Sequence, residues 1–280
     1  IVHSAGYDSI PSDLGVFDLA ARVAADEAGT LTDTTLVLLG GSGGFGGGSV
    51  ESLLGVLAAR RDDPAMRAAL DDPYTLSPDR SAEPDLGAQP DVPGARFDAV
   101  AEQWVIPFVP LGPGNARMVR RSNALLGYRY GRELRYQESI GLGSGPLSAA
   151  AARIGGAGLQ ALDWAVTHKP VGALLAGLIR RRSPPAGDGP SEEARRAGSF
   201  RLQIVTRTTS GARYVEDVAA QGDPGYTATA LMMGQTGLAE VLTSPGGSPT
   251  GVLTPAAAYG ATLLDRLRAA GMTFESRLLP

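Results

Sequence analysis

A polar turn close to the N-terminus, residues 6–13 (GYDSIPSD), has the residue types most suited to chemistry, namely a phenol, two carboxylates and two serine hydroxyls. It follows residues 1–5, which we expect to form a buried strand, and open α/β sheets bind ligands beyond the carboxyl ends of their strands. Ser12 and Asp13 are also typical N-caps of a helix, which we expect to continue to about Ala28. The turn therefore predicts either a ligand site or an ordinary helix start.

A glycine-rich loop over residues 40–48, GGSGGFGGG, is the second candidate. It lies between an expected strand at 33–40 and an expected helix at about 50–61, and backbone N–H groups at a helix N-terminus bind phosphate or carboxylate. The loop lacks the dinucleotide fingerprint, which has an acidic residue about 20 positions later. Either the loop moves over a cleft without binding, or it contacts the substrate or the outer edge of a cofactor. In the second case the contacting residues would be Ser42, Gly43 and Gly44.

Three arginines, Arg117, Arg120 and Arg121, lie on a helix that we expect over residues 116–126. Arg117 and Arg121 are four residues apart and therefore share a face. Their guanidinium groups could bind a substrate carboxylate, a thioester carbonyl or a phosphopantetheine phosphate through forked hydrogen bonds. The alternative is a solvated surface helix.

Composition excludes several classes of function. A length of 280 residues with 43 % hydrophobic residues permits a sizeable core. The net charge of −4 gives no basic footprint, so we expect no nucleic-acid partner. The chain has no cysteine and only two histidines, His3 and His168, so we expect no disulfide, thiolate nucleophile or metal site.

The elements that must position these candidates alternate between strands and helices. Besides those already named, we expect strands at 104–109, 134–140, 200–209, 212–221 and 274–279, and helices at 223–242 and 254–270. This order predicts an α+β fold with a mixed or antiparallel sheet, preceded by the last βα unit of a Rossmann domain. Residues 71–95 are expected to form a surface excursion. We expect the strand charges Glu138, Glu216 and Asp217 on exposed faces.

Residues 146–180 differ from the rest of the chain because they are apolar, glycine-broken and predicted to be helical. Asp163 and Lys169 interrupt the apolar run, which therefore falls short of the roughly 20 residues that a membrane span requires. One alternative is a packed helical hairpin that covers the sheet. The other is an amphipathic surface that lines an acyl-chain pocket or makes peripheral membrane contact through residues 159–182.

Several ordered motifs resemble the saccharopine dehydrogenase-like oxidoreductases, closest to their trans-acting enoyl reductase branch. Two departures are Ala5, where this branch often has cysteine, and Phe45, where threonine is typical. The motifs that carry the resemblance are GYDSIPSDLG (6–15), SGG (42–44), VRRSNALL (119–126), GPSEEAR (189–195), GDPGYTATALM (222–232) and GVLTPAAAYG (251–260).

The resemblance implies a cytoplasmic, homodimeric oxidoreductase that transfers a hydride from NADPH or NADH to an enoyl or acyl lipid intermediate. It implies catalytic roles for Tyr7, Asp8 and Ser9, and cofactor contacts for Gly6 and Asp13. The Tyr7 phenol could protonate the carbon that hydride addition leaves anionic. Two alternatives are a saccharopine-type dehydrogenase acting on an amino-acid-derived imine and a non-catalytic, lipid-associated scaffold.

The resemblance also implies that most of the cofactor is bound by an N-terminal Rossmann domain. The chain opens inside an expected strand that needs neighbouring strands to satisfy its backbone groups. We therefore expect a C-terminal portion of a longer protein, with residues 1–30 as a Rossmann remnant and residues 31–280 as a substrate and dimerisation domain. We expect this portion to be inactive alone.

Overall fold

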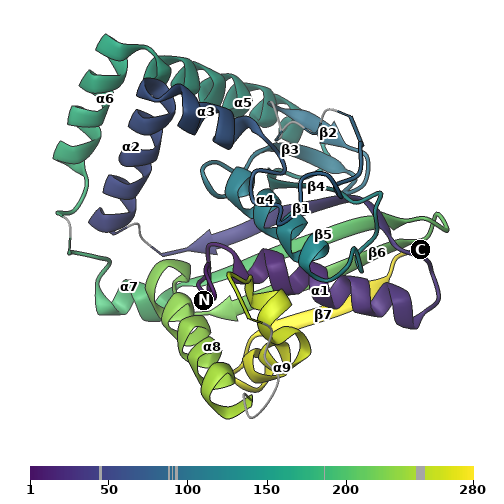
Figure 1. Ribbon diagram of the computed structural model, residues 1–280. Helices are drawn as coiled ribbons and strands as arrows, with labels where there is room; N and C mark the ends of the chain where they lie inside the picture. Colours follow the sequence, from purple (N-terminus) through teal and green to yellow (C-terminus); the bar gives the residue numbers. More distant parts are fainter. Residues whose placement is uncertain (44–45, 88, 90, 92–93, 186, 244–249) are drawn as a thin grey trace.

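The computed structural model describes residues 1–43, 46–87, 89, 91, 94–185, 187–243 and 250–280. Within them it confirms the α+β class, with one mixed sheet in the order β2-β3-β4-β1-β5-β6-β7 (Figure 1). Strands β1 and β4 pair in parallel and the other neighbours pair antiparallel. The strands are β1 (Leu31–Ser42), β2 (Arg96–Asp98), β3 (Gln103–Pro107), β4 (Arg135–Gly141), β5 (Ser199–Thr208), β6 (Arg213–Gln221) and β7 (Thr273–Leu278).

Helices cover one face of this sheet and extend beyond one of its ends. Figure 1 shows α1 and α4 lying across the face, with α9 beside them. The helices are α1 (Ile10–Ala25), α2 (Gly47–Asp62), α3 (Pro64–Asp71), α4 (Leu111–Leu125), α5 (Pro146–Thr167), α6 (Lys169–Arg182), α7 (Glu192–Ala197), α8 (Thr229–Thr243) and α9 (Pro255–Ala269). A π-helical turn, η1 (Pro224–Ala228), precedes α8.

The main core forms where α1 crosses the sheet. Ile10 and Leu14 of α1 are fully buried, as are Leu36 of β1, Ile204 of β5 and Val218 of β6. These strand residues share the face that is turned toward α1, because side chains of alternate residues project to the same side of a sheet. Burial of these apolar side chains fixes α1 across the strands and thereby fixes the turn that precedes it.

The segment before α1 differs from the expected buried strand. Val2 forms one isolated parallel bridge with Leu253, Ile1 is 78 % exposed, and the segment is not part of the sheet. Ser4 has a φ of 62°, which breaks the extended conformation that a strand requires. The residues from Ile1 to Ser4 therefore lie against the loop before α9.

Helices α5 and α6 pack against each other and, together with α2, form what we call the arm, which projects from the β3 end of the sheet (Figure 1). Gly155 of α5 lies against Ile106 of β3, where a Cβ atom at position 155 would have ordinary van der Waals contact. None of the helices that the structure describes is long and apolar enough to cross a membrane.

Candidate functional site

A buried chain of hydrogen bonds joins the N-terminal turn to α4 and β4. The Ser9 hydroxyl donates to Oδ1 of Asn115 (2.9 Å), and Nδ2 of Asn115 donates to Oε2 of Glu138 (3.0 Å). The Tyr136 hydroxyl donates to Oε1 of Glu138 (2.8 Å). All four residues are buried, and we call them the Glu138 network. It holds the turn, the helix and the strand in one fixed arrangement, because breaking it would leave buried polar groups without partners.

The position of Glu138 corrects the expectation of an exposed strand charge. Only 4 % of this residue is exposed, because it shares the α4-facing side of β4 with Tyr136 and Ile140. Gly112 allows α4 to approach closely, since a Cβ atom at position 112 would lie 3.2 Å from Cβ of Glu138. The alternation of Tyr136, Glu138 and Ile140 was the sequence signal that could have located this residue.

Burial changes the acid-base behaviour of Glu138. Desolvation raises the pKa of Glu138 to about 7, although hydrogen bonds from Ser12, Asn115 and Tyr136 favour the ionised form. The carboxyl group therefore changes protonation near neutral pH. A buried carboxyl group with this property, directly behind a polar turn, is typical of functional sites.

Tyr7 and Asp8 extend this arrangement toward the surface. The Tyr7 backbone N–H donates to Oγ1 of Thr229 (3.1 Å), and its ring packs edge-on against Phe200 with centroids 4.8 Å apart. Burial, followed by the negative charges of Glu138 and Asp8, raises the pKa of Tyr7 well above its usual value, so the phenol stays neutral. Asp8 is exposed, and partial desolvation raises the pKa of its carboxyl group. The structure thus brings Tyr7, Asp8 and Ser9 together beside Glu138.

The two residues predicted to contact a cofactor lie in different environments. Gly6 belongs to the turn, where a Cβ atom would lie 3.0 Å from Cγ2 of Thr229. Asp13 is fully buried and accepts hydrogen bonds from the Ala256 N–H (2.8 Å) and from the Ser122 hydroxyl. Asp13 therefore caps α9 and not its own helix. Helix α1 begins at Ile10, earlier than expected, without a side-chain cap from Ser9.

The described part of the glycine loop packs against other loops of the protein. Ser42 ends β1, and its hydroxyl accepts a hydrogen bond from the Ser199 N–H (3.1 Å). Gly43 lies against Asp223, and a Cβ atom at Gly46 would lie only 1.8 Å from the Tyr226 hydroxyl. Gly44, the third predicted contact, lies outside the described residues. The glycines that the structure describes at this junction permit close packing around Asp223 and Tyr226.

Asp223 caps the helix that the sequence predicts from residue 223. Its carboxylate accepts hydrogen bonds from the backbone N–H groups of Tyr226 (2.9 Å) and Thr227 (3.0 Å). The first turn that it caps is π-helical, and α8 follows at Thr229. The cap therefore holds the segment whose Thr229 hydroxyl accepts from Tyr7.

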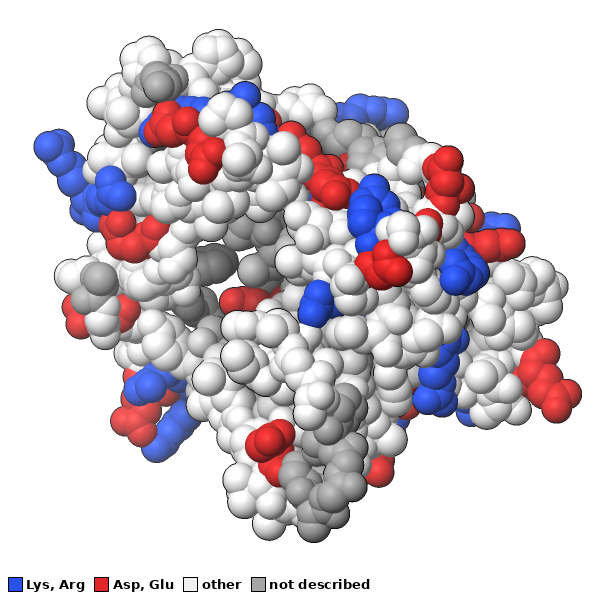
Figure 2. Space-filling model, in the orientation of Figure 1, with Lys and Arg blue, Asp and Glu red and all other residues white. Residues whose placement is uncertain are grey.

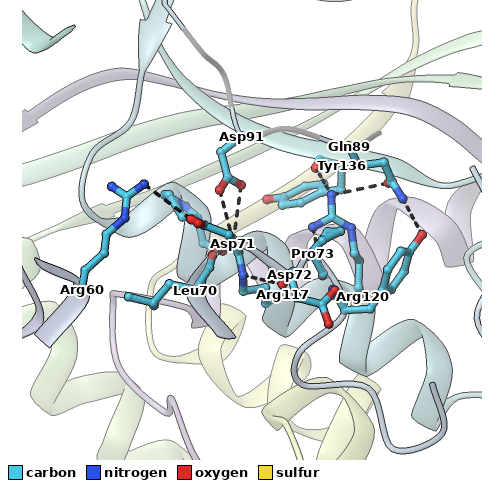
Figure 3. A network of polar contacts seen from close by, with 12 residues as sticks. Arg60, Leu70, Asp71, Asp72, Pro73, Gln89, Asp91, Arg117, Arg120 and Tyr136 are labelled. Carbon is cyan, nitrogen blue, oxygen red and sulfur yellow. Dashed lines mark hydrogen bonds and ion pairs between the residues drawn. The ribbon is translucent and has the colours of Figure 1, made fainter. Parts of the chain in front are cut away.

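Arg117 is directed at the excursion that follows α3, as Figure 3 shows. Its Nε donates to the Asp72 carbonyl (3.1 Å), and its Nη2 donates to the Leu70 carbonyl. It also forms an ion pair with Asp91 (3.3 Å). The side chain is buried, so a solvated surface position, the alternative to binding, is wrong for this arginine.

The other two arginines also donate to backbone carbonyls. Nη2 of Arg120 donates to the Tyr136 carbonyl (3.0 Å), and this side chain is buried too (Figure 3). Arg121 donates to the carbonyls of Leu76 and Val252 (both 2.5 Å). Together the three arginines hold α4 against segments that are distant in the sequence.

The start of α2 does not offer an open pyrophosphate cradle at Gly47. A Cβ atom at Gly47, in the first turn of α2, would lie 2.2 Å from the Pro185 carbonyl oxygen, and the Gly47 N–H donates to the Asp188 carbonyl (3.1 Å). Protein groups therefore occupy the approach that a phosphate would need. No group of acidic and histidine side chains among the described residues could hold a metal ion.

The N-terminal turn lies beside a depression in the surface. Figure 2 shows that this face of the molecule is hollowed between the arm and the region where the N-terminus lies in Figure 1. Ligands bind preferentially in concave regions that combine apolar walls with a few polar groups. Tyr7 and Asp8 belong to the turn that follows this N-terminal segment, and the Asp8 side chain is exposed.

Comparison with known proteins supplies the family. No family model and no solved structure matches the chain. The chain is 45 % identical over its whole length to a Mycobacterium tuberculosis protein and covers 67 % of that relative. It is 41 % identical to a trans-acting enoyl reductase of Mycobacterium ulcerans and 40 % identical to one of Mycobacterium leprae, and it covers 68 % of each. The Mycobacterium tuberculosis relative is named for the same activity. On this similarity, the chain belongs to the trans-acting enoyl reductase family.

Proposed function

We propose that the N-terminal turn and the Glu138 network form the substrate side of an enoyl reductase site that acts on an α,β-unsaturated acyl lipid intermediate. The observation that carries the proposal is the neutral Tyr7 phenol near a buried carboxyl group, with the Tyr7 ring packed on Phe200 and its backbone N–H bonded to Thr229. The enoyl reductase names of relatives that are 40 to 45 % identical support the same reaction.

Reduction of a conjugated double bond adds a hydride to the β-carbon and a proton to the α-carbon. A reduced nicotinamide, NADPH or NADH, would supply the hydride. Because protein groups occupy the approach to Gly47 at the start of α2, we propose that most of the cofactor contacts come from the third of the relatives' length that this chain does not cover. The proton then has to come from a group at the substrate side.

Tyr7 is the proposed proton donor. Its raised pKa keeps the proton on the phenol throughout the neutral range, and transfer to the basic α-carbon remains favourable. The backbone hydrogen bond to Thr229 and the contact with Phe200 restrict the position of the ring. Ser9 and Asn115 are proposed as positioning residues, since they attach the turn to Glu138.

The test is turnover of a long-chain 2-enoyl thioester by the product of the complete reading frame, followed through the nicotinamide absorbance. Replacement of Tyr7 by phenylalanine should lower kcat by about 100-fold or more, because general acid catalysis contributes at least that much. Tyr128→Phe, a loop tyrosine after α4, is the matched control and should keep full turnover. The 280-residue chain alone should not consume NADPH.

Two outcomes would contradict these proposals. Full turnover by Tyr7→Phe would remove the phenol from the reaction and leave the reductase function standing. No oxidation of NADPH or NADH with enoyl substrates would overturn the reductase function itself.

A further inference from the structure

The outward face of α5 is apolar along almost its whole length. Leu147 is 85 % exposed, Ile154 75 % and Trp164 58 %. The residues between them on this face are exposed alanines and a glycine. Packing against the body uses the opposite side of the helix, where Ala152 and Gly156 are buried. The exposed apolar face is therefore not needed to hold α5 in place.

The charged side chains of α5 are directed away from this face. The Arg153 guanidinium lies 4.9 Å from the centroid of the Trp104 ring on β3. Asp163 forms an ion pair with Arg60 of α2 (3.2 Å). Arg153 thus contacts an aromatic ring of β3 and Asp163 pairs with α2 of the arm, although both side chains stay exposed to solvent.

Helix α6 also has exposed apolar side chains and ends in a basic cluster. Leu174 is 74 % exposed and Leu178 44 %. Arg180 forms an ion pair with Glu51 of α2 (2.8 Å), whereas Arg181 and Arg182 are exposed at the end of the helix. Apolar side chains beside exposed arginines are typical of helices that lie in a membrane interface.

Formal charge separates the two helices from the rest of the chain. Residues 146–182 contain five basic residues and one acidic residue, which gives a formal charge of +4. Since the whole chain has a net charge of −4, the remaining residues have a formal charge of −8. The two helices with the exposed apolar side chains are thus also positively charged, and they complement an anionic surface.

We propose that the outward faces of α5 and α6 dock on an anionic lipid bilayer. The helices would lie in the interface, because no described helix is both long and apolar enough to cross. Trp164 suits this position, since tryptophan favours the boundary between head groups and acyl chains. A second copy of the chain is the less favoured occupant, because two arms with a charge of +4 repel each other. The proposal is independent of the reductase function, since none of these residues belongs to the Glu138 network or the turn.

The test is flotation of the chain with vesicles of phosphatidylcholine alone and of phosphatidylcholine mixed with phosphatidylglycerol. We expect binding to the mixed vesicles, and at least tenfold weaker binding for the double variant Ile154→Glu/Leu174→Glu. Met233→Glu/Val241→Glu is the matched control, because these α8 residues are equally apolar and exposed. Arg181→Gln/Arg182→Gln should weaken binding to the mixed vesicles only.

A second measurement does not depend on folding of the charged variants. In a Trp104→Phe background, Trp164 is the only tryptophan, and its emission should shift to the blue when mixed vesicles are added. Absence of both flotation and shift would overturn the proposal, as would equal binding to neutral and mixed vesicles. Self-association without lipid binding, detected by sedimentation and abolished by Ile154→Glu/Leu174→Glu, would assign the face to a second copy and overturn it as well.

Discussion

The carboxylate of Asp13 in α1 accepts a hydrogen bond from the backbone N–H of Ala256 in the first turn of α9, at 2.8 Å and 243 residues away in the sequence. The Ser122 hydroxyl of α4 contacts the same carboxylate and also bonds to Thr254 (2.6 Å). One buried acidic side chain therefore joins the three helices that cover the sheet. Asp13 is completely buried, and this desolvation raises the pKa of its carboxyl group to about 6.

Replacement of Asp13 by alanine should lower the free energy of unfolding by about 2 to 3 kcal/mol, because it leaves the Ala256 N–H and the Ser122 hydroxyl without an acceptor. Asp13→Asn should cost less, since its amide oxygen can still accept one of these bonds. Urea denaturation measures both values. Asp33→Ala, at an exposed position of β1, serves as the control, and an equal loss in this variant would argue against a specific cap.

The Glu138 network predicts a difference between two substitutions of similar size. Glu138→Leu should lower the free energy of unfolding by about 2 to 4 kcal/mol, because Asn115 and Tyr136 would keep buried donors without acceptors. Glu138→Gln should lower the free energy of unfolding less, since its one side-chain oxygen can still accept a hydrogen bond. Thermal unfolding would show this order. Glu133→Leu is the exposed control, and a network without structural importance would give the two leucine variants the same stability.

Glu216 was also expected on an exposed face, but it is fully buried beneath α1 on the inward face of β6. Asp217, the third of these strand charges, projects to the opposite face, where it pairs with Arg201 (3.2 Å) and Arg277 (2.7 Å). Desolvation, with the negative charge of Asp18 as the second cause, raises the pKa of Glu216 to about 9. The folded protein therefore keeps a protonated glutamic acid in its core at neutral pH.

The stability of the protein should consequently fall as pH rises between about 5 and about 9. In the unfolded chain Glu216 ionises near its usual pKa, whereas in the folded protein it stays protonated up to about pH 9. Between these two pH values ionisation stabilises only the unfolded chain, so the free energy of unfolding falls as the pH rises. Glu216→Gln should remove about 2 kcal/mol or more of this pH-dependent loss. Denaturation at several pH values tests this prediction. Glu275→Gln, exposed on β7, should keep the original pH dependence, and an unchanged slope in Glu216→Gln would contradict the assignment.

Gly46 approaches Tyr226 closely, so a larger residue at position 46 should clash with the tyrosine side chain, and removal of that side chain should relieve the clash. Gly46→Ala should lower the free energy of unfolding by about 1 to 3 kcal/mol, because its Cβ atom would lie 1.8 Å from the Tyr226 hydroxyl. Gly48→Ala has no atom within 4 Å of its Cβ and should be neutral or slightly stabilising. In a Tyr226→Ala background the cost of Gly46→Ala should largely disappear, and a cost that persists would place the strain elsewhere.

Local signals in the sequence predicted much of the secondary structure. Strands were expected at 200–209 and 212–221 with only Ser210-Gly211 between them, and the structure pairs them as the β5–β6 hairpin with Gly211 at a φ of 86°. Thr254-Pro255 predicted the start of α9, where the Thr254 hydroxyl accepts from the Ala257 N–H. These elements could be predicted because the residues that determine them are close together in the sequence.

The α+β class was therefore determined by the sequence alone, through periodicity, caps and turn residues. Tertiary structure alone decided which polar residues meet. Ser9 donates a hydrogen bond to Asn115, which is 106 residues away in the sequence. Arg117 donates to the backbone of the excursion before β2 and is not part of an exposed site. The physical reason is that an exposed polar side chain can hydrogen-bond to water and gains little from any particular protein partner. Once the side chain is buried, an unmade hydrogen bond costs free energy, and the packing decides which partners are within reach. Only the packing of α1 and α4 on the sheet removes water from Glu138 and Glu216, so their burial and altered pKa values arise with the fold.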